Sequence, residues 1–135
     1  MQILIVEENP DLARIWSAHL TRQGMNVSHA QSKSEAHALV TERAFDVVIL
    51  DADIDGGRPI ALADFISYRL PKARVIFVTN TSFFSDGSIF ALASNAHACV
   101  STDADPSDIV SLVDYHARAA RQQVGSSGPS GPSNG

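Results

Sequence analysis

The sequence has very little of what several classes of protein require. It contains a single cysteine, Cys99, among 135 residues, so no internal disulfide can form, and a lone thiol suits a reducing compartment. No apolar run approaches the roughly 20 residues that a membrane-spanning helix needs. The first residues enter an apolar segment directly, without the basic stretch that opens a secretory signal. From these absences we expect a cytoplasmic protein that does not contact a membrane.

Positive charge is also scarce. Ten Lys and Arg residues stand against fifteen Asp and Glu, for a formal net charge of −5, and the basic residues form no cluster along the chain. A nucleic-acid-binding face depends on grouped basic side chains that neutralise phosphates. We therefore expect this domain to bind no nucleic acid.

What the sequence does contain is a series of short, continuous apolar runs. Continuous runs are typical of parallel strands that helices cover on both faces, whereas half-exposed strands alternate. The runs cover residues 3–6, 45–50, 75–78 and 98–100, and a weaker, alternating run at 25–29 predicts an edge strand.

Segments with helical spacing separate these runs. In the first, Asn9 and Pro10 form a good helix start and Gly24 follows the end. Its predicted apolar face consists of Leu12, Ile15, Trp16, His19 and Leu20. Further helices are predicted around residues 36–40, 60–66, 89–93 and 109–116. Either Ser32 or Ser34 could cap the second helix, and either Asp105 or Ser107 the last.

Five strands alternating with five helices predict an α/β fold. Right-handed crossovers then give a single-domain, doubly wound (βα)5 flavodoxin-like parallel sheet, which we place at residues 1–121. Residues 122–135 are rich in Gly, Ser and Pro and predict a flexible tail, either native or derived from a cloning vector. In such sheets, ligands bind beyond the carboxyl ends of the strands. The candidate functional residues are therefore those that directly follow each run.

Acidic residues follow two of these runs. Glu7 and Glu8 come after the first run, and Asp51 ends the central one. Carboxylates held close together cannot all stay ionised without a cation between them, and Mg²⁺ fits such a site. Taken alone, the acidic pair is explained at least as well by a second interpretation, in which Glu7 and Glu8 simply favour the start of the helix near Pro10 and bind no metal. The addition of Asp51 favours the metal site.

Asp51 has a second chemical capability, because a carboxylate can act as a nucleophile and carry a phosphoryl group as an acyl phosphate. Such a transfer depends mainly on positioning and on neutralising the charge of the oxygens. Thr79, at the end of the next strand, could donate its hydroxyl to a phosphoryl oxygen. A simple turn residue is the alternative interpretation of Thr79.

With these features together, the sequence resembles the receiver domains of bacterial response regulators from residue 1 to about residue 120. Residues 3–9 (Ile-Leu-Ile-Val-Glu-Glu-Asn) look like the opening strand with its acidic pair. Residues 45–51 look like the strand that ends in the phosphoacceptor, and residues 75–79 like the strand that carries the switch hydroxyl. Each motif is loose, but the three in this order at these separations are fairly specific.

The resemblance implies that Asp51 accepts a phosphoryl group from a histidine kinase or a phosphotransfer protein, so the domain is an acceptor and not an enzyme. Glu8 would bind Mg²⁺ directly, Glu7 through water, and Asp53 through its backbone carbonyl. Thr79 would turn toward the phosphoryl group. The signal would pass to a downstream protein, to an output domain of a longer chain, or through a homodimer. The contact surface would include Phe83, Phe84, Ser88 and Asn95.

The sequence departs from the family pattern at several positions. Thr102 stands where a lysine is usual, and losing a charge-assisted hydrogen bond worth roughly 1.5–3 kcal/mol would weaken the phosphorylated state by about ten- to a hundredfold. Cys99 stands at the position of the switch aromatic residue, and the acidic pair is Glu-Glu where at least one Asp is usual. A pseudo-receiver that binds proteins independently of phosphorylation therefore remains an alternative.

Three other classes of protein match parts of the sequence less well. Residues 50–53 and 78–80 resemble the first two motifs of haloacid-dehalogenase-type phosphatases, but that family places its first motif on its first strand. Residues 51–56 match the start of an EF-hand loop, yet Leu62 occupies the twelfth position, where an acid is required. The first strand–helix turn is acidic and lacks glycine, which argues against a nucleotide-binding module.

Overall fold

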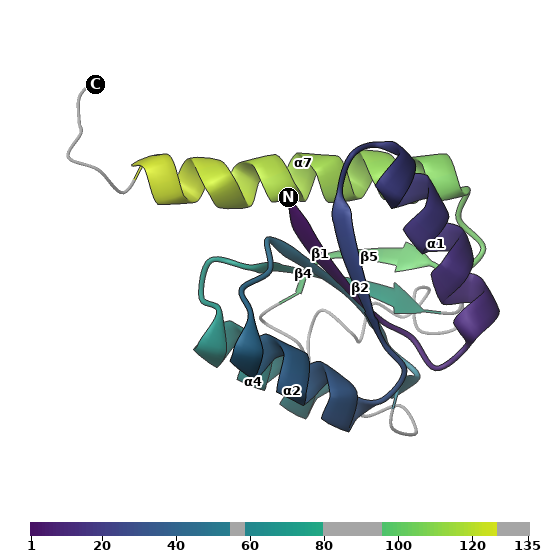
Figure 1. The fold of residues 1–135 in the computed structure, drawn as a ribbon, viewed down its shortest axis with the longest axis horizontal. Coiled ribbons are helices and arrows are strands. Elements are labelled where there is room, and N and C mark those ends of the chain that lie inside the picture. The colour runs from purple at the N-terminus through teal and green to yellow at the C-terminus, as the bar shows by residue number, and fades with distance from the viewer. Residues whose placement is uncertain (55–58, 80–95, 127–135) are drawn as a thin grey trace.

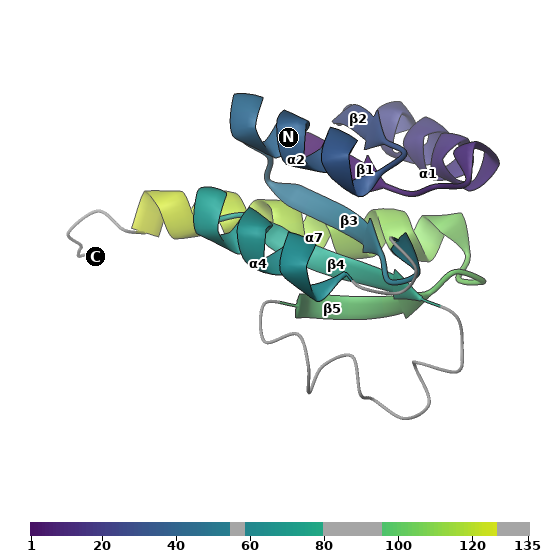
Figure 2. The same cartoon turned by 90° about the horizontal axis from the view of Figure 1, so that it is seen from below.

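The computed structural model describes residues 1–54, 59–79 and 96–126, and it confirms the predicted fold class. Five parallel strands form one sheet in the order β2-β1-β3-β4-β5 (Figure 2). The strands are β1 (Gln2–Val6), β2 (Asn26–Ala30), β3 (Val47–Asp51), β4 (Arg74–Thr79) and β5 (Ala96–Ser101). Each predicted apolar run lies within or overlaps one of these strands.

Helices cover both faces of the sheet (Figure 1). Helices α1 (Pro10–Arg22) and α7 (Pro106–Ser126) lie on one face, and α2 (Lys33–Glu42) and α4 (Ile60–Arg69) lie on the other. The helix predicted around residues 89–93 falls outside the described residues. Helix α7 continues past residue 121 and projects beyond the amino-terminal edge of the sheet. Within the described ranges, no helix combines the length and the apolarity needed to cross a bilayer.

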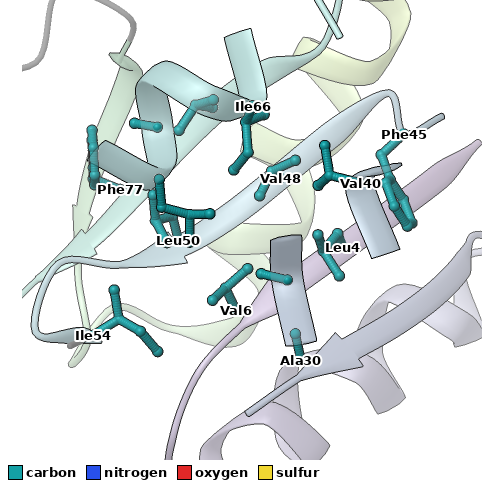
Figure 3. Close-up of a cluster of buried hydrophobic side chains, with 14 of the residues drawn as sticks. Leu4, Val6, Ala30, Val40, Phe45, Val48, Leu50, Ile54, Ile66 and Phe77 are labelled. Carbon is teal, nitrogen blue, oxygen red and sulfur yellow. The ribbon is translucent and has the colours of Figure 1, made fainter. Parts of the chain in front are cut away.

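The continuous apolar runs form strands because both faces of the sheet are buried. Leu4, Val48, Leu50 and Phe77 point toward α2 and α4, in a cluster that also contains Val40 and Ile66 (Figure 3). The intervening strand residues, including Ile3, Ile5 and Ile49, join Trp16, Leu20 and Val113 on the opposite face. Two fully packed layers therefore hold β1, β3 and β4 in a fixed relation.

Helix α1 begins and ends where the sequence predicts. Oδ1 of Asn9 accepts hydrogen bonds from the amides of Asp11 at 3.0 Å and Leu12 at 3.4 Å. Gly24, after the last turn, has a φ of 87°, which glycine adopts readily. The prediction that Ile15 belongs to the buried face was wrong, because Ile15 is 48% exposed. The buried residues are Ala13, Trp16 and Leu20. The buried face thus keeps Trp16 and Leu20 from the predicted stripe and is rotated toward Ala13, away from Ile15.

The structure also decides which residues cap α2 and α7. Oγ of Ser32 accepts from the amide of Glu35 at 3.1 Å, so Ser32 and not Ser34 caps α2. Oδ1 of Asp105 accepts from both the amide and the hydroxyl of Ser107 at 2.9 Å. Asp105 therefore satisfies the first turn of α7, and Ser107 lies within the helix.

We expect Ser32→Ala to lower the free energy of unfolding by about 1 kcal/mol, since it leaves an amide in the first turn of α2 without its acceptor. Urea denaturation monitored by circular dichroism measures this change. Ser34→Ala is the matched control, because it removes a hydroxyl from an exposed neighbour that bonds no backbone amide of the first turn. An equal loss of stability in the two variants would contradict the assignment of Ser32 as the cap.

Candidate functional site

The register of the sheet brings three polar side chains to one edge. Strand β1 pairs with β3 so that Val6 lies opposite Leu50, and β3 pairs with β4 so that Asp51 lies opposite Val78. The amide of Ala52 still donates to the carbonyl of Val78, at 2.8 Å, so this pairing continues past the end of β3. Glu7, Asp51 and Thr79 consequently lie at the carboxyl edge of three adjacent strands.

Glu7 and Asp51 are both buried, with exposed fractions of 4% and 6%. Oε2 of Glu7 accepts from the amide of Asn9 at 3.1 Å, and Oδ1 of Asp51 accepts from the amide of Asp53 at 3.0 Å. The other Glu7 oxygen, Oε1, is buried and has no hydrogen-bond partner within the part of the chain that the structure describes. Each carboxyl is thus held by one backbone amide in the turn that follows its strand.

Burial makes both carboxyls difficult to ionise. It raises the pKa of Glu7 from 4.5 to about 7, with the amide of Asn9 opposing this shift and the charge of Asp51 adding to it. Burial likewise raises the pKa of Asp51, against the lowering effect of the Asp53 amide. The exposed carboxylate of Glu8 acts on both in the same direction. This edge of the sheet therefore has an excess of negative charge that a cation would relieve.

Thr79 is fully buried at the end of β4, and its hydroxyl has no hydrogen-bond partner among the residues described. Its carbonyl accepts from the amide of Thr102 at 2.9 Å, which places Thr102 beside it, directly after β5. Cys99 is half-buried on β5, pairs in register with Phe77 and packs against the cluster under α4. Burial raises the pKa of the Cys99 thiol, so the thiol stays protonated and acts as a small apolar side chain.

The structure brings together some of the predicted site residues and leaves others apart. Glu7 and Asp51 are close enough for each to affect the pKa of the other, and Thr79 and Thr102 lie at the ends of the next two strands. The side chains of Glu8 and Asp53 are exposed. No group of three or more His, Cys, Asp or Glu side chains has a metal-binding arrangement within the described ranges. The predicted contact residues Phe83, Phe84, Ser88 and Asn95 lie outside those ranges.

One residue at this edge, His29, could not be assigned to the site from any pattern in the sequence. Nε2 of His29, near the end of β2, lies 2.8 Å from the backbone carbonyl of Glu7. The contact joins residues 22 positions apart, and it follows only from the parallel register of β1 and β2.

An open parallel sheet with acidic residues and a buried hydroxyl at its carboxyl edge defines a receiver-type α/β domain. The sequence matches the response regulator receiver domain over residues 3–114, so the chain belongs to this family of two-component signalling proteins. Receiver domains are in general signalling domains and not enzymes. The prediction of the family from the sequence is confirmed.

Two curated relatives share part of this sequence. The response regulator protein PilR of Pseudomonas aeruginosa is 28% identical over 76 residues, which is 56% of this chain and 17% of PilR. The transcriptional activator protein ExaE of Pseudomonas putida is 35% identical over 80 residues, which is 57% of this chain and 37% of ExaE. The matched segments thus span well under half of either relative.

Solved receiver structures share the fold at low identity. A CheY-like receiver domain protein from Methanospirillum hungatei has a TM-score of 0.81 at 20% identity, over 90% of this chain and 97% of that chain. NtrX from Brucella abortus also has a TM-score of 0.81 at 20% identity, over 93% of this chain but only 28% of that chain. The same fold thus occurs both as nearly a whole chain and as one part of a longer one.

The raised pKa of Glu7 predicts how stability depends on pH in metal-free buffer. The folded protein keeps the Glu7 proton up to about pH 7, whereas the unfolded chain releases it near pH 4.5. The free energy of unfolding should therefore fall as the pH rises through this window. Glu7→Gln should flatten that fall and make the protein more stable at neutral pH, and urea denaturation at a series of pH values in the presence of a chelator measures both.

The matched control is Glu8→Gln, which removes an exposed carboxylate and should retain most of the slope. The raised pKa of Asp51 contributes in the same direction, so a small slope should persist in Glu7→Gln. Equal slopes in the wild type and Glu7→Gln would show that Glu7 ionises normally in the folded protein.

Proposed function

We propose that this receiver domain accepts a phosphoryl group on Asp51 in the presence of Mg²⁺ and signals by contact with another protein. The phosphoryl donor is a phosphohistidine of a histidine kinase or a phosphotransfer protein. One observation carries the proposal. Asp51 ends the central strand between a second buried carboxyl, Glu7, and the buried hydroxyl of Thr79, whose oxygen has no partner among the described residues.

The donor set at this edge suits Mg²⁺. This cation takes few protein oxygens, keeps several waters and binds phosphate oxygens. Asp51, Glu8 and the backbone carbonyl of Asp53 would hold it directly, and Glu7 through water. The buried, unpartnered Oε1 of Glu7 and the raised pKa of both carboxyls support this fit. When bound, the cation supplies positive charge to the carboxylates and to the incoming phosphoryl oxygens.

One carboxylate oxygen of Asp51 would attack the phosphorus atom of the donor. Oδ1 accepts from the Asp53 amide, and in the proposed step Oδ2, which does not accept this bond, is the attacking oxygen. A new bond forms between Oδ2 and phosphorus, and the bond from phosphorus to the donor nitrogen breaks, with its electron pair leaving on that nitrogen.

The hydroxyl of Thr79 would donate a hydrogen bond to a phosphoryl oxygen. A buried hydroxyl without a partner costs about 1–3 kcal/mol, and this bond would give the Thr79 hydroxyl a partner that it does not have among the described residues. The backbone of Thr79 also accepts from the amide of Thr102. A movement of Thr79 would therefore be transmitted to the start of the turn after β5.

A pseudo-receiver is the second candidate function. Thr102 can offer a neutral hydroxyl but not the positive charge of the lysine usual at this position, and Cys99 has no ring to reorient. In this alternative the domain binds its partner in one conformation, and Asp51 is never modified. The two candidates differ in whether Asp51 reacts.

We expect incubation with Mg²⁺ and acetyl phosphate or carbamoyl phosphate to add the mass of one phosphoryl group, as measured by intact mass spectrometry. Asp51→Ala should abolish the addition, and a chelator should do the same. Asp53→Asn is the matched control, because it neutralises the nearest exposed acid and keeps both the Asp53 amide and its carbonyl. No mass change in the wild type at millimolar donor would support the pseudo-receiver.

We expect Thr102→Lys to raise the steady-state phosphorylated fraction, because it restores a charge-assisted hydrogen bond to a phosphoryl oxygen. The lifetime of the acyl phosphate or its occupancy should rise by about tenfold or more. Thr102→Met matches the length of the new side chain without its charge and should leave the occupancy near that of the wild type. If both variants behaved alike, the missing charge would not limit phosphorylation.

A further inference from the structure

The end of β1 is held by β2 through both backbone groups of one residue. The amide of Glu7 donates to the carbonyl of Ala30 at 3.0 Å, and the carbonyl of Glu7 lies 2.8 Å from Nε2 of His29. A carbonyl oxygen can only accept, so Nε2 of the ring carries the hydrogen and donates it. The residue that opens the acidic pair is therefore anchored to the edge strand on both sides.

The register of the two strands explains why His29 reaches this carbonyl. His29 pairs with Ile5 and Ala30 pairs with Val6, and the ring of His29 reaches past Val6 to the carbonyl of Glu7, just after the end of β1. His29 is exposed on the edge strand, where it lines a shallow hollow with Pro10, Ala13, Arg14 and Ser17. The ring contributes little to the core, and its contact with Glu7 is its principal described interaction.

The hydrogen bond to the Glu7 carbonyl also restrains the orientation of Glu8. The carbonyl carbon of Glu7 and the amide nitrogen of Glu8 belong to one planar peptide unit, so holding the carbonyl fixes the plane from which Glu8 leaves the chain. The Glu8 side chain is exposed and one methylene longer than aspartate, so it loses more rotational freedom when it binds a metal. A fixed starting direction reduces that loss.

We propose that His29 is a positioning residue for the Glu7–Glu8 pair, and that its hydrogen bond to the Glu7 carbonyl sets the direction in which Glu8 meets Mg²⁺. This inference rests on the proposed Mg²⁺ site. The proposed role of His29 is exerted through the backbone, by the hydrogen bond from its Nε2 to the Glu7 carbonyl. Partners of this kind, which orient a metal ligand, typically change metal affinity by 10–100-fold when they are removed.

Two substitutions separate the hydrogen bond from the presence of the side chain. His29→Leu removes the donor and keeps a side chain of similar bulk. His29→Gln places an amide nitrogen at about the position of Nε2 and retains the donor. The measurement is isothermal titration calorimetry of the full chain with Mg²⁺ alone, with Asp51→Asn as a reference that removes a proposed ligand.

We expect His29→Leu to weaken Mg²⁺ binding by about tenfold and His29→Gln to remain within about twofold of the wild type. Equal affinity of His29→Leu and the wild type would overturn the inference while leaving the proposed Mg²⁺ site intact. Equal weakening in both variants would also overturn it, since the donor would then be irrelevant. No Mg²⁺ binding by the wild type would overturn the proposed site and, with it, the role of His29.

A metal-free measurement tests the structural half of the inference independently. The amide nitrogen of Glu8 belongs to the peptide whose carbonyl accepts the bond, so its NMR chemical shift should change in His29→Leu and stay near the wild-type value in His29→Gln. An unchanged Glu8 signal in His29→Leu would show that the bond is not formed in solution and would overturn the proposal without reference to Mg²⁺.

Discussion

Glu7 and Asp51 lie at the same edge of the sheet, with almost all of their surface removed from water, and the features of the site depend on how this charge is accommodated. Each carboxyl accepts one hydrogen bond from a backbone amide. This bond does not offset the effect of burial, so the pKa of each carboxyl stays above its ordinary value. Three strands, packed on both faces, force the two groups into this relation. The fold thus gives up part of its stability at neutral pH to bury these two groups, and either protonation or a nearby cation would reduce that cost.

The sequence predicts the parts of this arrangement that depend on local pattern. The runs that became β1, β3 and β4 were recognisable because both of their faces are buried, and Asn9, Pro10 and Gly24 marked the ends of α1. A residue at or directly after the end of such a run must lie at the carboxyl edge of the sheet. The sequence alone therefore predicts that Glu7, Asp51 and Thr79 lie there.

What could not be predicted depends on packing or on register. The exposure of Ile15 follows from the rotation of α1 about its axis, which the apolar stripe alone does not determine. The capping role of Ser32 over Ser34 is a matter of one residue at the helix start, where sequence signals are weakest. The contact between His29 and Glu7 requires the alignment of two strands that no local motif encodes.

Two residues at the end of β5, Thr102 and Cys99, have structural roles that do not depend on the proposed chemistry. Thr102 keeps the backbone bond to Thr79 that joins the last two strands, although it lacks the charge of a lysine. Cys99, on β5, packs against the apolar cluster under α4 as a small apolar residue. Cys99 thus contributes to the apolar packing of the sheet, and Thr102 contributes to the backbone pairing of its last two strands.

The buried oxygens of Glu7 and Thr79, which lack a partner among the described residues, place this site in conflict with the stability of the fold. Smaller or apolar side chains at these two positions would relieve a desolvation penalty. The residues proposed to carry the chemistry are therefore distinct from those that stabilise the sheet, and stability and reactivity at this edge would respond in opposite directions to the same substitution.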